Sequence, residues 1–143
     1  MVWGAISIRG KSNLLIVQGN IDANAYQNNI LTPGLLPFLN ALPNPGQMEF
    51  QHDGATVHTA RTTNQFLRAN NVQVMGPWPA KSPDLNPIEH LWSMIGTAAR
   101  NGPNPPRNQD EMAQALIREW NAIDNWTIQR LIYSKRRRCT ARY

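Results

Sequence analysis

The stretch WPAKSPDLNPIEHLW occupies residues 78–92 and indicates where one helix of the chain begins. Asn86 is of a type that caps helix N-termini, and Pro87 suits the first helical position because its missing N–H would have no partner there. The apolar residues that follow recur at intervals of three and four: Ile88, Leu91, Trp92 and Ile95. This spacing predicts a helix that buries one face.

Glu89 lies three residues after this cap, and two interpretations of it stay open. A glutamate at that position can close a capping box by accepting from the backbone N–H of the capping residue. At about 100° per residue, Glu89 also lies on the flank of the buried face, where its carboxylate can be directed along a sheet that the helix covers. The second interpretation makes Glu89 a candidate metal ligand.

The shorter stretch QHDGATVH, residues 51–58, places a second acid at the end of a predicted strand. Met48 and Phe50 are typical of a strand, Asp53 follows them, and Gly54 permits a sharp exit. An acid at the C-terminal end of a strand lies where open α/β sheets bind their ligands. The alternative is a turn aspartate that bonds to its own backbone. Asp53 is therefore the second candidate metal ligand.

Strands and helices are expected to alternate along the rest of the chain. In the first half, the pattern predicts a hairpin from strands at 1–8 and 13–18, then a helix from Asp22 that breaks near Pro33, and a second short helical piece that ends before Pro43. A strand ending at Asp53, a helix over 58–70 and a strand over 72–75 are predicted next. The helix after Asn86, another after Asn108 and a last one over 127–133 complete the predicted order. Such alternation needs crossover connections, so it predicts an α/β fold with partly parallel strand pairing.

The formal net charge of +5 is concentrated at the C-terminus. Residues 129–143 hold six bases and no acid, whereas residues 1–128 hold eight bases against nine acids. A basic run is most often a solvated segment, but it can also contact phosphates or act in nuclear import. The candidate nucleic-acid-binding residues in this basic C-terminal tail, 129–143, are Lys135, Arg136, Arg137 and Arg138.

Other classes of protein are disfavoured by what the sequence lacks. No apolar run approaches the roughly 18 residues of a membrane-spanning helix. The first residues do not show the basic-then-apolar pattern of a signal peptide. With Cys139 as its single cysteine, the chain has no internal disulfide and no zinc site of the CxxC type. No membrane partner is expected.

Three strings resemble the catalytic domain of the Tc/mariner-type transposases, the D-D-E enzymes of the ribonuclease-H-like superfamily. They are MVWGAIS at residues 1–7, QHDGATVHTA at 51–60 and WPAKSPDLNPIEHLW at 78–92, of which the last is the most specific. The resemblance extends to at least Trp120. It implies an α/β fold over residues 1–128, with a ribonuclease-H-like mixed sheet that is flanked by helices and lacks the first strand.

By this resemblance, Asp53 and Glu89 correspond to the second and third acids of the family, so both are implied as catalytic and metal-binding. Such enzymes use two Mg²⁺ or Mn²⁺ ions, which prefer carboxylate oxygens and stabilise charge on the attacking and leaving oxygens. The first acid, its strand and an N-terminal helix-turn-helix region are expected outside these 143 residues. Residues 54–88 make the spacing between the two acids one residue longer than is commonest in the family.

The three histidines, His52, His58 and His90, flank these acids. Direct ligation of metal by any of them is less expected than a supporting hydrogen bond to a carboxylate or a phosphate.

The resemblance implies a fragment of a DNA transposase, whose family performs metal-dependent DNA cleavage and strand transfer at transposon ends. DNA would be the partner, the nucleus the location, and a homodimer the assembly of related enzymes. With two of three acids, the 143 residues alone are expected to bind metal poorly and to show weak or no activity. The alternatives are a non-catalytic nucleic-acid-binding or interaction module derived from a transposase, and a related nuclease that uses other acids.

Overall fold

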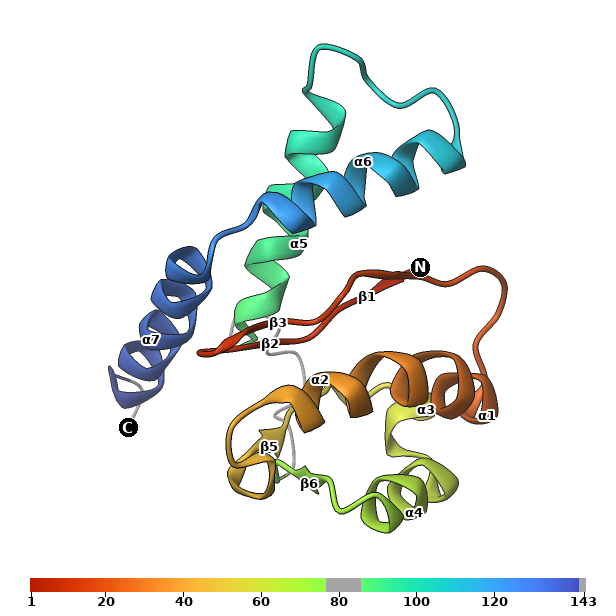
Figure 1. Cartoon of the computed structure of the whole chain (residues 1–143), viewed down its shortest axis with the longest axis vertical. Coiled ribbons are helices and arrows are strands. Elements are labelled where there is room, and N and C mark those ends of the chain that lie inside the picture. Colours follow the sequence, from red (N-terminus) through yellow and green to blue (C-terminus); the bar gives the residue numbers. More distant parts are fainter. Residues whose placement is uncertain (77–85, 142–143) are drawn as a thin grey trace. The chain divides into compact units, whose positions relative to one another are not determined.

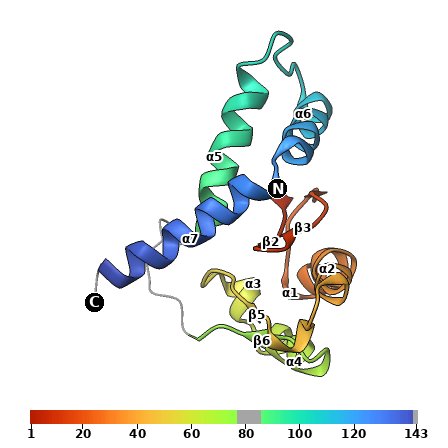
Figure 2. The same cartoon turned by 60° about the vertical axis from the view of Figure 1, so that its left-hand side comes forward.

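The computed structural model describes residues 1–76 and 86–141, apart from the side chains of residues 136 and 138–141. These residues form two compact units, one from residues 1–5 and 15–76 and the other from 6–14 and 86–141. We call them unit 1 and unit 2 and describe each by itself (Figure 1; Figure 2). Residues 77–85, which hold most of the SPDLNP string, lie outside the description.

The predicted N-terminal strands pair in two short antiparallel ladders. In unit 1, β1 (Val2–Trp3) pairs with β4 (Leu15–Ile16), and in unit 2, β2 (Ile6–Ser7) pairs with β3 (Gly10–Lys11). Two residues lead from β1 to β2, whereas three lead from β3 to β4. The register of the β2–β3 pair is therefore offset by one residue from that of the β1–β4 pair, as happens at a β-bulge.

The helix predicted from Asp22 starts as expected. α1 (Ala23–Ala25) is capped by Asp22, whose carboxylate accepts from the Ala25 N–H at 2.7 Å. The chain then winds as a π-helix, η1 (Tyr26–Leu35), and runs directly into α2 (Leu36–Ala41), so that Figure 1 shows a continuous helical stretch.

The break predicted near Pro33 is therefore wrong. In an α-helix the proline ring would clash with the carbonyl four residues earlier. In η1 the hydrogen bonds reach five residues back, as from the Leu36 N–H to the Leu31 carbonyl. The wider turn relieves that clash, which is why Pro33 lies inside the helix rather than at its end.

The rest of unit 1 follows the predicted order of strand, helix and strand. The elements are η2 (Pro45–Gln47), β5 (Glu49–Phe50), α3 (Thr56–Thr59), α4 (Arg61–Ala69) and β6 (Gln73–Val74). β5 and β6 pair in parallel, with Glu49 opposite Gln73, so the parallel pairing is confirmed. The single helix expected over 58–70 is instead two, because Ala60 adopts an extended conformation between them.

The core of unit 1 gathers around the continuous helical stretch. Its buried members are Tyr26, Ile30, Leu31, Leu35, Leu67 and Val72. Trp3, from β1, packs against this cluster from its edge. A Cβ at Gly34 would lie 2.7 Å from the Trp3 ring and 2.8 Å from Leu15, so this helix and the β1–β4 pair approach closely only because residue 34 is glycine.

Unit 2 contains two long helices that start where they were predicted to start. α5 (Pro87–Arg100) starts at Asn86, whose side chain accepts from the Ile88 N–H at 3.2 Å. α6 (Gln109–Ala122) starts at Asn108, whose side chain accepts from the Glu111 N–H at 2.8 Å. The buried face of α5 carries Leu91, Ile95 and Ala99.

Trp120 joins these helices to the β2–β3 region. Its ring stacks on Trp92 with centroids 5.3 Å apart, and it is fully buried. Its indole N–H donates to the Ser12 carbonyl at 2.9 Å. Because a buried indole N–H needs a partner, this bond fixes the ring as well as the loop before β4.

α7 (Asn125–Ala141) is longer than the helix predicted over 127–133. Five of the six basic residues of the predicted tail lie within it, Arg142 lies outside the described residues, and the predicted boundary at residue 128 falls inside the helix. Ile128 is fully buried. None of the helices in the described part of the chain is both long and apolar enough to cross a membrane.

Replacing Gly34 with alanine tests the close approach inside unit 1. We expect Gly34→Ala to lower the free energy of unfolding by about 1–3 kcal/mol through overpacking. The matched control is Gly96→Ala in α5, where a Cβ would meet only the flexible end of Arg100 at 3.4 Å. That variant should gain about 0.5–1 kcal/mol. Urea unfolding followed by circular dichroism measures both, and an equal gain in the two variants would contradict the predicted contact.

Candidate active site around Asp53

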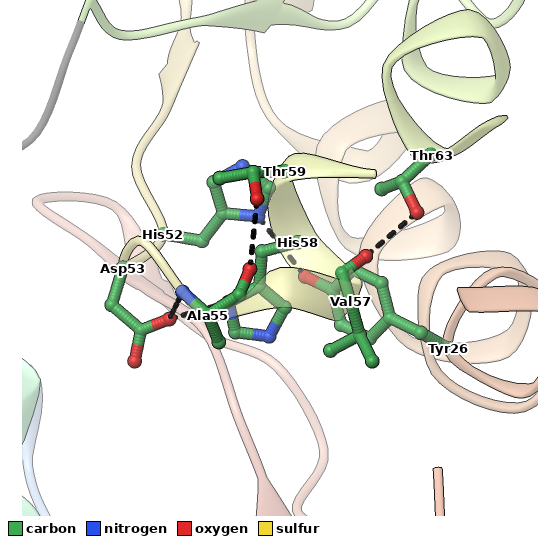
Figure 3. A network of polar contacts seen from close by, with 8 residues as sticks. All are labelled: Tyr26, His52, Asp53, Ala55, Val57, His58, Thr59 and Thr63. Atoms are coloured by element: carbon green, nitrogen blue, oxygen red, sulfur yellow. Dashed lines mark hydrogen bonds and ion pairs between the residues drawn. The ribbon is translucent and has the colours of Figure 1, made fainter. Parts of the chain in front are cut away.

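Asp53 lies in the loop between β5 and α3, and its carboxylate is held on one oxygen. Oδ1 accepts from the Ala55 N–H at 3.0 Å and lies 2.6 Å from Nδ1 of His58 (Figure 3). The strand predicted to end at Asp53 ends at Phe50, so three residues of loop carry the acid away from the sheet. The side chain is 60% exposed.

The second oxygen, Oδ2, has no hydrogen-bond partner among the residues that the structure describes. Figure 3 shows it directed away from the network that holds Oδ1. The bond to Ala55 is the turn that the sequence left open as an alternative. Because that turn uses Oδ1 alone, it does not prevent Asp53 from binding a cation through Oδ2.

A stack of aromatic rings lies behind the carboxylate. The imidazoles of His52 and His58 are nearly parallel, with centroids 5.0 Å apart and an interplanar angle of 12°. Tyr26 lies on His58 at 4.5 Å, and its hydroxyl is 3.2 Å from Nδ1 of His52. Phe50 contacts His52 with centroids 4.8 Å apart. Tyr26 is 1% exposed, so the stack is anchored in the core of unit 1.

A hydrogen bond from α4, which is itself supported by η1, fixes the short helix α3. Thr63, which is fully buried, donates its hydroxyl to the Val57 carbonyl at 2.7 Å (Figure 3). Gln27, in η1, donates to the Thr63 hydroxyl at 3.4 Å. A helix of one turn is not stable by itself, so these contacts with its neighbours keep His58 in place.

The electrostatics favour an ionised Asp53 beside neutral Tyr26 and His52. Partial burial alone would raise the pKa of Asp53, but the Ala55 amide and the neighbouring His58 and His52 outweigh it and hold the pKa below its usual value. Burial, and secondly His58, lower the pKa of His52 to about 4, against the opposing effect of Asp53. Burial, and secondly Asp53, raise the pKa of Tyr26, so its hydroxyl stays protonated and can donate to His52.

Glu89 lies in the first turn of α5 and is exposed. Its backbone N–H donates to the Asn86 carbonyl at 3.2 Å. Within residues 1–76 and 86–141, its carboxylate has no hydrogen bond or ion pair, and the capping box that the sequence left open is not closed. The Asn86 side chain caps this helix, so the Glu89 carboxylate is not used by the cap.

The two candidate acids belong to different units, Asp53 to unit 1 and Glu89 to unit 2. Within the described part of the chain, no three His, Cys, Asp or Glu side chains are grouped so as to hold a metal ion. Metal binding by Asp53 and Glu89 stays a prediction.

The supporting role expected of the histidines is found at His58, which bonds to Asp53. His52 bonds to Tyr26 instead, and His90 is exposed on α5. Tyr26 was missed by the sequence analysis, because 26 residues separate it from His52 and no local pattern joins the two.

The candidate nucleic-acid-binding residues of the basic tail lie in the second half of α7. Arg137 is exposed and Lys135 is half-buried. The side chains of Arg136 and Arg138 lie outside the description. Their role in binding nucleic acid stays a prediction.

The sequence matches the family described as DDE superfamily endonuclease over residues 1–113. The chain belongs to this family. Its relatives among the DDE proteins include the Tc1 transposase of Caenorhabditis elegans, 35% identical over 142 residues that make up 99% of this chain and 50% of the relative. The Tc3 transposase of the same species is 30% identical over 136 residues, 94% of this chain and 40% of the relative. The chain thus spans about half the length of the curated relatives it matches.

Solved structures of DDE transposases confirm the fold. A structure of the Mos1 transposase catalytic domain and raltegravir with Mg matches with a TM-score of 0.76, at 24% identity, over 94% of this chain and 67% of that chain. A crystal structure of the catalytic domain of Mos1 mariner transposase matches with a TM-score of 0.67, at 27% identity, over 85% and 60%. The predicted α/β fold of ribonuclease-H-like type and the predicted Tc/mariner relationship are both confirmed.

The lowered pKa of His52 predicts how stability depends on pH. An unfolded His52 takes up a proton near pH 6.5, whereas the folded one does so only near pH 4. Stability should therefore fall as the pH drops through this window, by at most about 1.4 kcal/mol per pH unit and by less because the ring is partly exposed. His52→Gln should flatten the slope between pH 6.5 and 4.5, as measured by urea unfolding.

His90→Gln is the matched control for this experiment, because His90 is exposed in unit 2. It should keep the slope of the wild type. The lowered pKa of Asp53 adds stability that is lost only as the pH falls below the usual range of an aspartate, so this loss lies below the interval from pH 6.5 to 4.5. A slope that His52→Gln leaves unchanged would contradict a neutral, half-buried His52.

Proposed function

We propose that these residues are part of the catalytic domain of a DNA transposase that cleaves DNA strands and joins transposon ends to target DNA in the nucleus. The observation that carries this proposal is Asp53, an exposed carboxylate in the loop after a parallel strand, with one oxygen fixed and the other open. It stands in a chain whose family and relatives are DDE endonucleases and transposases.

In this proposal Asp53 and Glu89 would hold Mg²⁺ or Mn²⁺. The donor chemistry fits, because both ions prefer carboxylate oxygens and both side chains are exposed. The low pKa of Asp53 leaves it ionised at neutral pH, which is the state that binds a cation. When bound, the metal supplies charge stabilisation for the oxygens that attack and leave phosphorus.

The chain's own residues prepare the carboxylate for that task. The Ala55 N–H and His58 fix Oδ1, so the carboxyl group has one preferred orientation before a cation arrives. Such preorganisation lowers the ordering cost of binding. A homodimer, as the assembly of related transposases, is part of the proposal.

Calorimetric titration with Mn²⁺ tests the proposal on the 143-residue chain. Binding should be weak but measurable in the wild type, and it should be lost in the double variant Asp53→Asn, Glu89→Gln, because amides lack the negative charge. A matched control removes two other exposed acids, one from each unit, as Glu49→Gln with Asp110→Asn. It should bind like the wild type.

Nicking of a supercoiled plasmid in the same buffers shows whether the bound metal supports strand cleavage. We expect little nicking by the 143 residues alone, and any nicking should disappear in the double variant. Equal Mn²⁺ binding by the wild type and the double variant would overturn the assignment of these acids.

A non-catalytic DNA-binding module is the second candidate function. It is favoured by the observation that the basic residues at 135–138 continue α7 as a helix. Absent metal binding together with retained DNA binding would support this candidate over the transposase.

A further inference from the structure

His58 is the side chain that determines how Asp53 presents its carboxylate. Nδ1 of His58 lies 2.6 Å from Oδ1 of Asp53, which is a short hydrogen bond. An ionised carboxylate only accepts hydrogen bonds, so the proton is on Nδ1 and the histidine is the donor. The Ala55 N–H reaches the same oxygen. Two donors on Oδ1 and none on Oδ2 among the described residues give the carboxylate two unequal oxygens.

The imidazole of His58 cannot turn freely, because two neighbouring rings pack against it. The Tyr26 ring packs against it with centroids 4.5 Å apart, and the His52 ring stacks on it at 5.0 Å. Tyr26 and His52 also contact each other, with centroids 6.4 Å apart and the Tyr26 hydroxyl 3.2 Å from Nδ1 of His52. The His58 side chain is only 20% exposed. Its backbone is held by α3, whose amide at His58 donates to the Ala55 carbonyl at 2.9 Å.

We propose that His58 is a positioning residue: it orients Asp53 so that Oδ2 faces a divalent cation, and it does not bind the cation itself. This proposal rests on the metal-binding role proposed for Asp53. Partners that orient a metal-binding carboxylate in this way typically change metal affinity by 10- to 100-fold when they are removed.

Two substitutions separate the hydrogen bond from the packing of the ring. His58→Asn keeps an N–H donor at about the place of Nδ1 but removes the stacked ring. His58→Phe keeps a ring packed against Tyr26 and His52 but removes the donor. If His58 acts through the hydrogen bond, Mn²⁺ affinity should stay close to wild type in His58→Asn and fall by about tenfold or more in His58→Phe.

Calorimetry gives the affinities, and melting temperatures without metal show whether either variant is destabilised. The ¹⁵N shifts of the His58 ring without metal give a second readout: the wild type should show the proton on Nδ1, and Asp53→Asn should alter that shift. The opposite order of affinities, with His58→Phe near wild type and His58→Asn weak, would show that packing matters and would overturn the positioning role.

Asp53→Asn separates this failure from failure of the proposed function. If the wild type binds Mn²⁺ and Asp53→Asn does not, the site exists, and equal binding by both His58 variants and the wild type overturns the role of His58 alone. If the wild type and Asp53→Asn bind equally, both proposals fail, and the pair of Asp53 and His58 only stabilises the turn before α3.

A second observation, independent of the first, concerns the exposed face of α7. Trp126, Arg130, Tyr133 and Arg137 follow one another at intervals of four, three and four residues. At about 100° per residue they lie within an arc of about 60°, on the side of the helix opposite the buried Ile128. Trp126 is 62% exposed and Tyr133 49%. The Arg130 guanidinium lies over the Trp126 ring at 4.5 Å.

We infer that this face of α7 binds single-stranded DNA. Its two arginines can pair with phosphates. Residues 129–143 contain no acid whose negative charge would repel the DNA backbone. Its two aromatic rings can stack on bases, which offer their faces only when they are not paired in a duplex. Alternating rings and cations on one face are the combination that such binding needs.

Fluorescence anisotropy of a labelled oligonucleotide in EDTA tests this face without any metal. Trp126→Gln with Tyr133→Gln should weaken binding to a single strand by fivefold or more without changing the salt dependence. Arg130→Gln with Arg137→Gln should reduce the salt slope by about 1.4, at about 0.7 for each phosphate contact of a single strand. The control Arg107→Gln with Arg118→Gln removes the same charge from exposed sites elsewhere in unit 2.

Unchanged affinity in the aromatic variant would overturn the stacking role. So would equal binding of a duplex of the same sequence, which would indicate only a general attraction of charges. Light scattering of the free chain checks for a second copy on this face, and loss of a dimer in the aromatic variant would also overturn the inference. The absence of metal makes these outcomes independent of Asp53 and Glu89.

Discussion

The arrangement around Asp53 depends on the burial of Tyr26. The core of unit 1 holds this ring, and the ring in turn gives the imidazoles of His52 and His58 a fixed surface to pack on. Its hydroxyl lies 3.2 Å from Nδ1 of His52, so a hydrogen bond fixes the stack in addition to the packing of the rings. Because the interior is close-packed, a shift of the Tyr26 ring would move the His58 ring. The Asp53 carboxylate, which is hydrogen-bonded to His58, would then shift as well. The exposed acid is thus controlled from the core.

Much of the fold could be predicted because its signals are local. A cap and the N–H that it satisfies are two or three residues apart, and the helix starts at Asp22, Asn86 and Asn108 were all predicted. The winding around Pro33 was not, because proline ordinarily ends a helix and only the surrounding packing favours the π turn. The bond from Trp120 to Ser12 spans 108 residues, and no pattern in the sequence indicates it.

In the candidate site, too, the features with a local signal were predicted and those that depend on distant contacts were not. The acid Asp53 and its turn were foreseen from residues 51–58, and the family resemblance marked Asp53 and Glu89 together. What makes Asp53 distinctive is the difference between its two oxygens, and this depends on the separation of α3 from α4 at Ala60. Periodicity predicted one helix there, since a single extended residue hardly disturbs the spacing of apolar side chains.

The π winding of η1 also bears on how this part of the chain can change in length. A π turn holds about one residue more than an α turn, so deleting one residue from Tyr26–Leu35, with Pro33 also replaced, would allow one turn to wind as an ordinary α turn. Tyr26 and Leu35 would then still face the core. Insertions and deletions in a helix usually rotate everything beyond them, but here the winding can absorb one. Homologous proteins can therefore differ by a residue in this helix and keep the same interior.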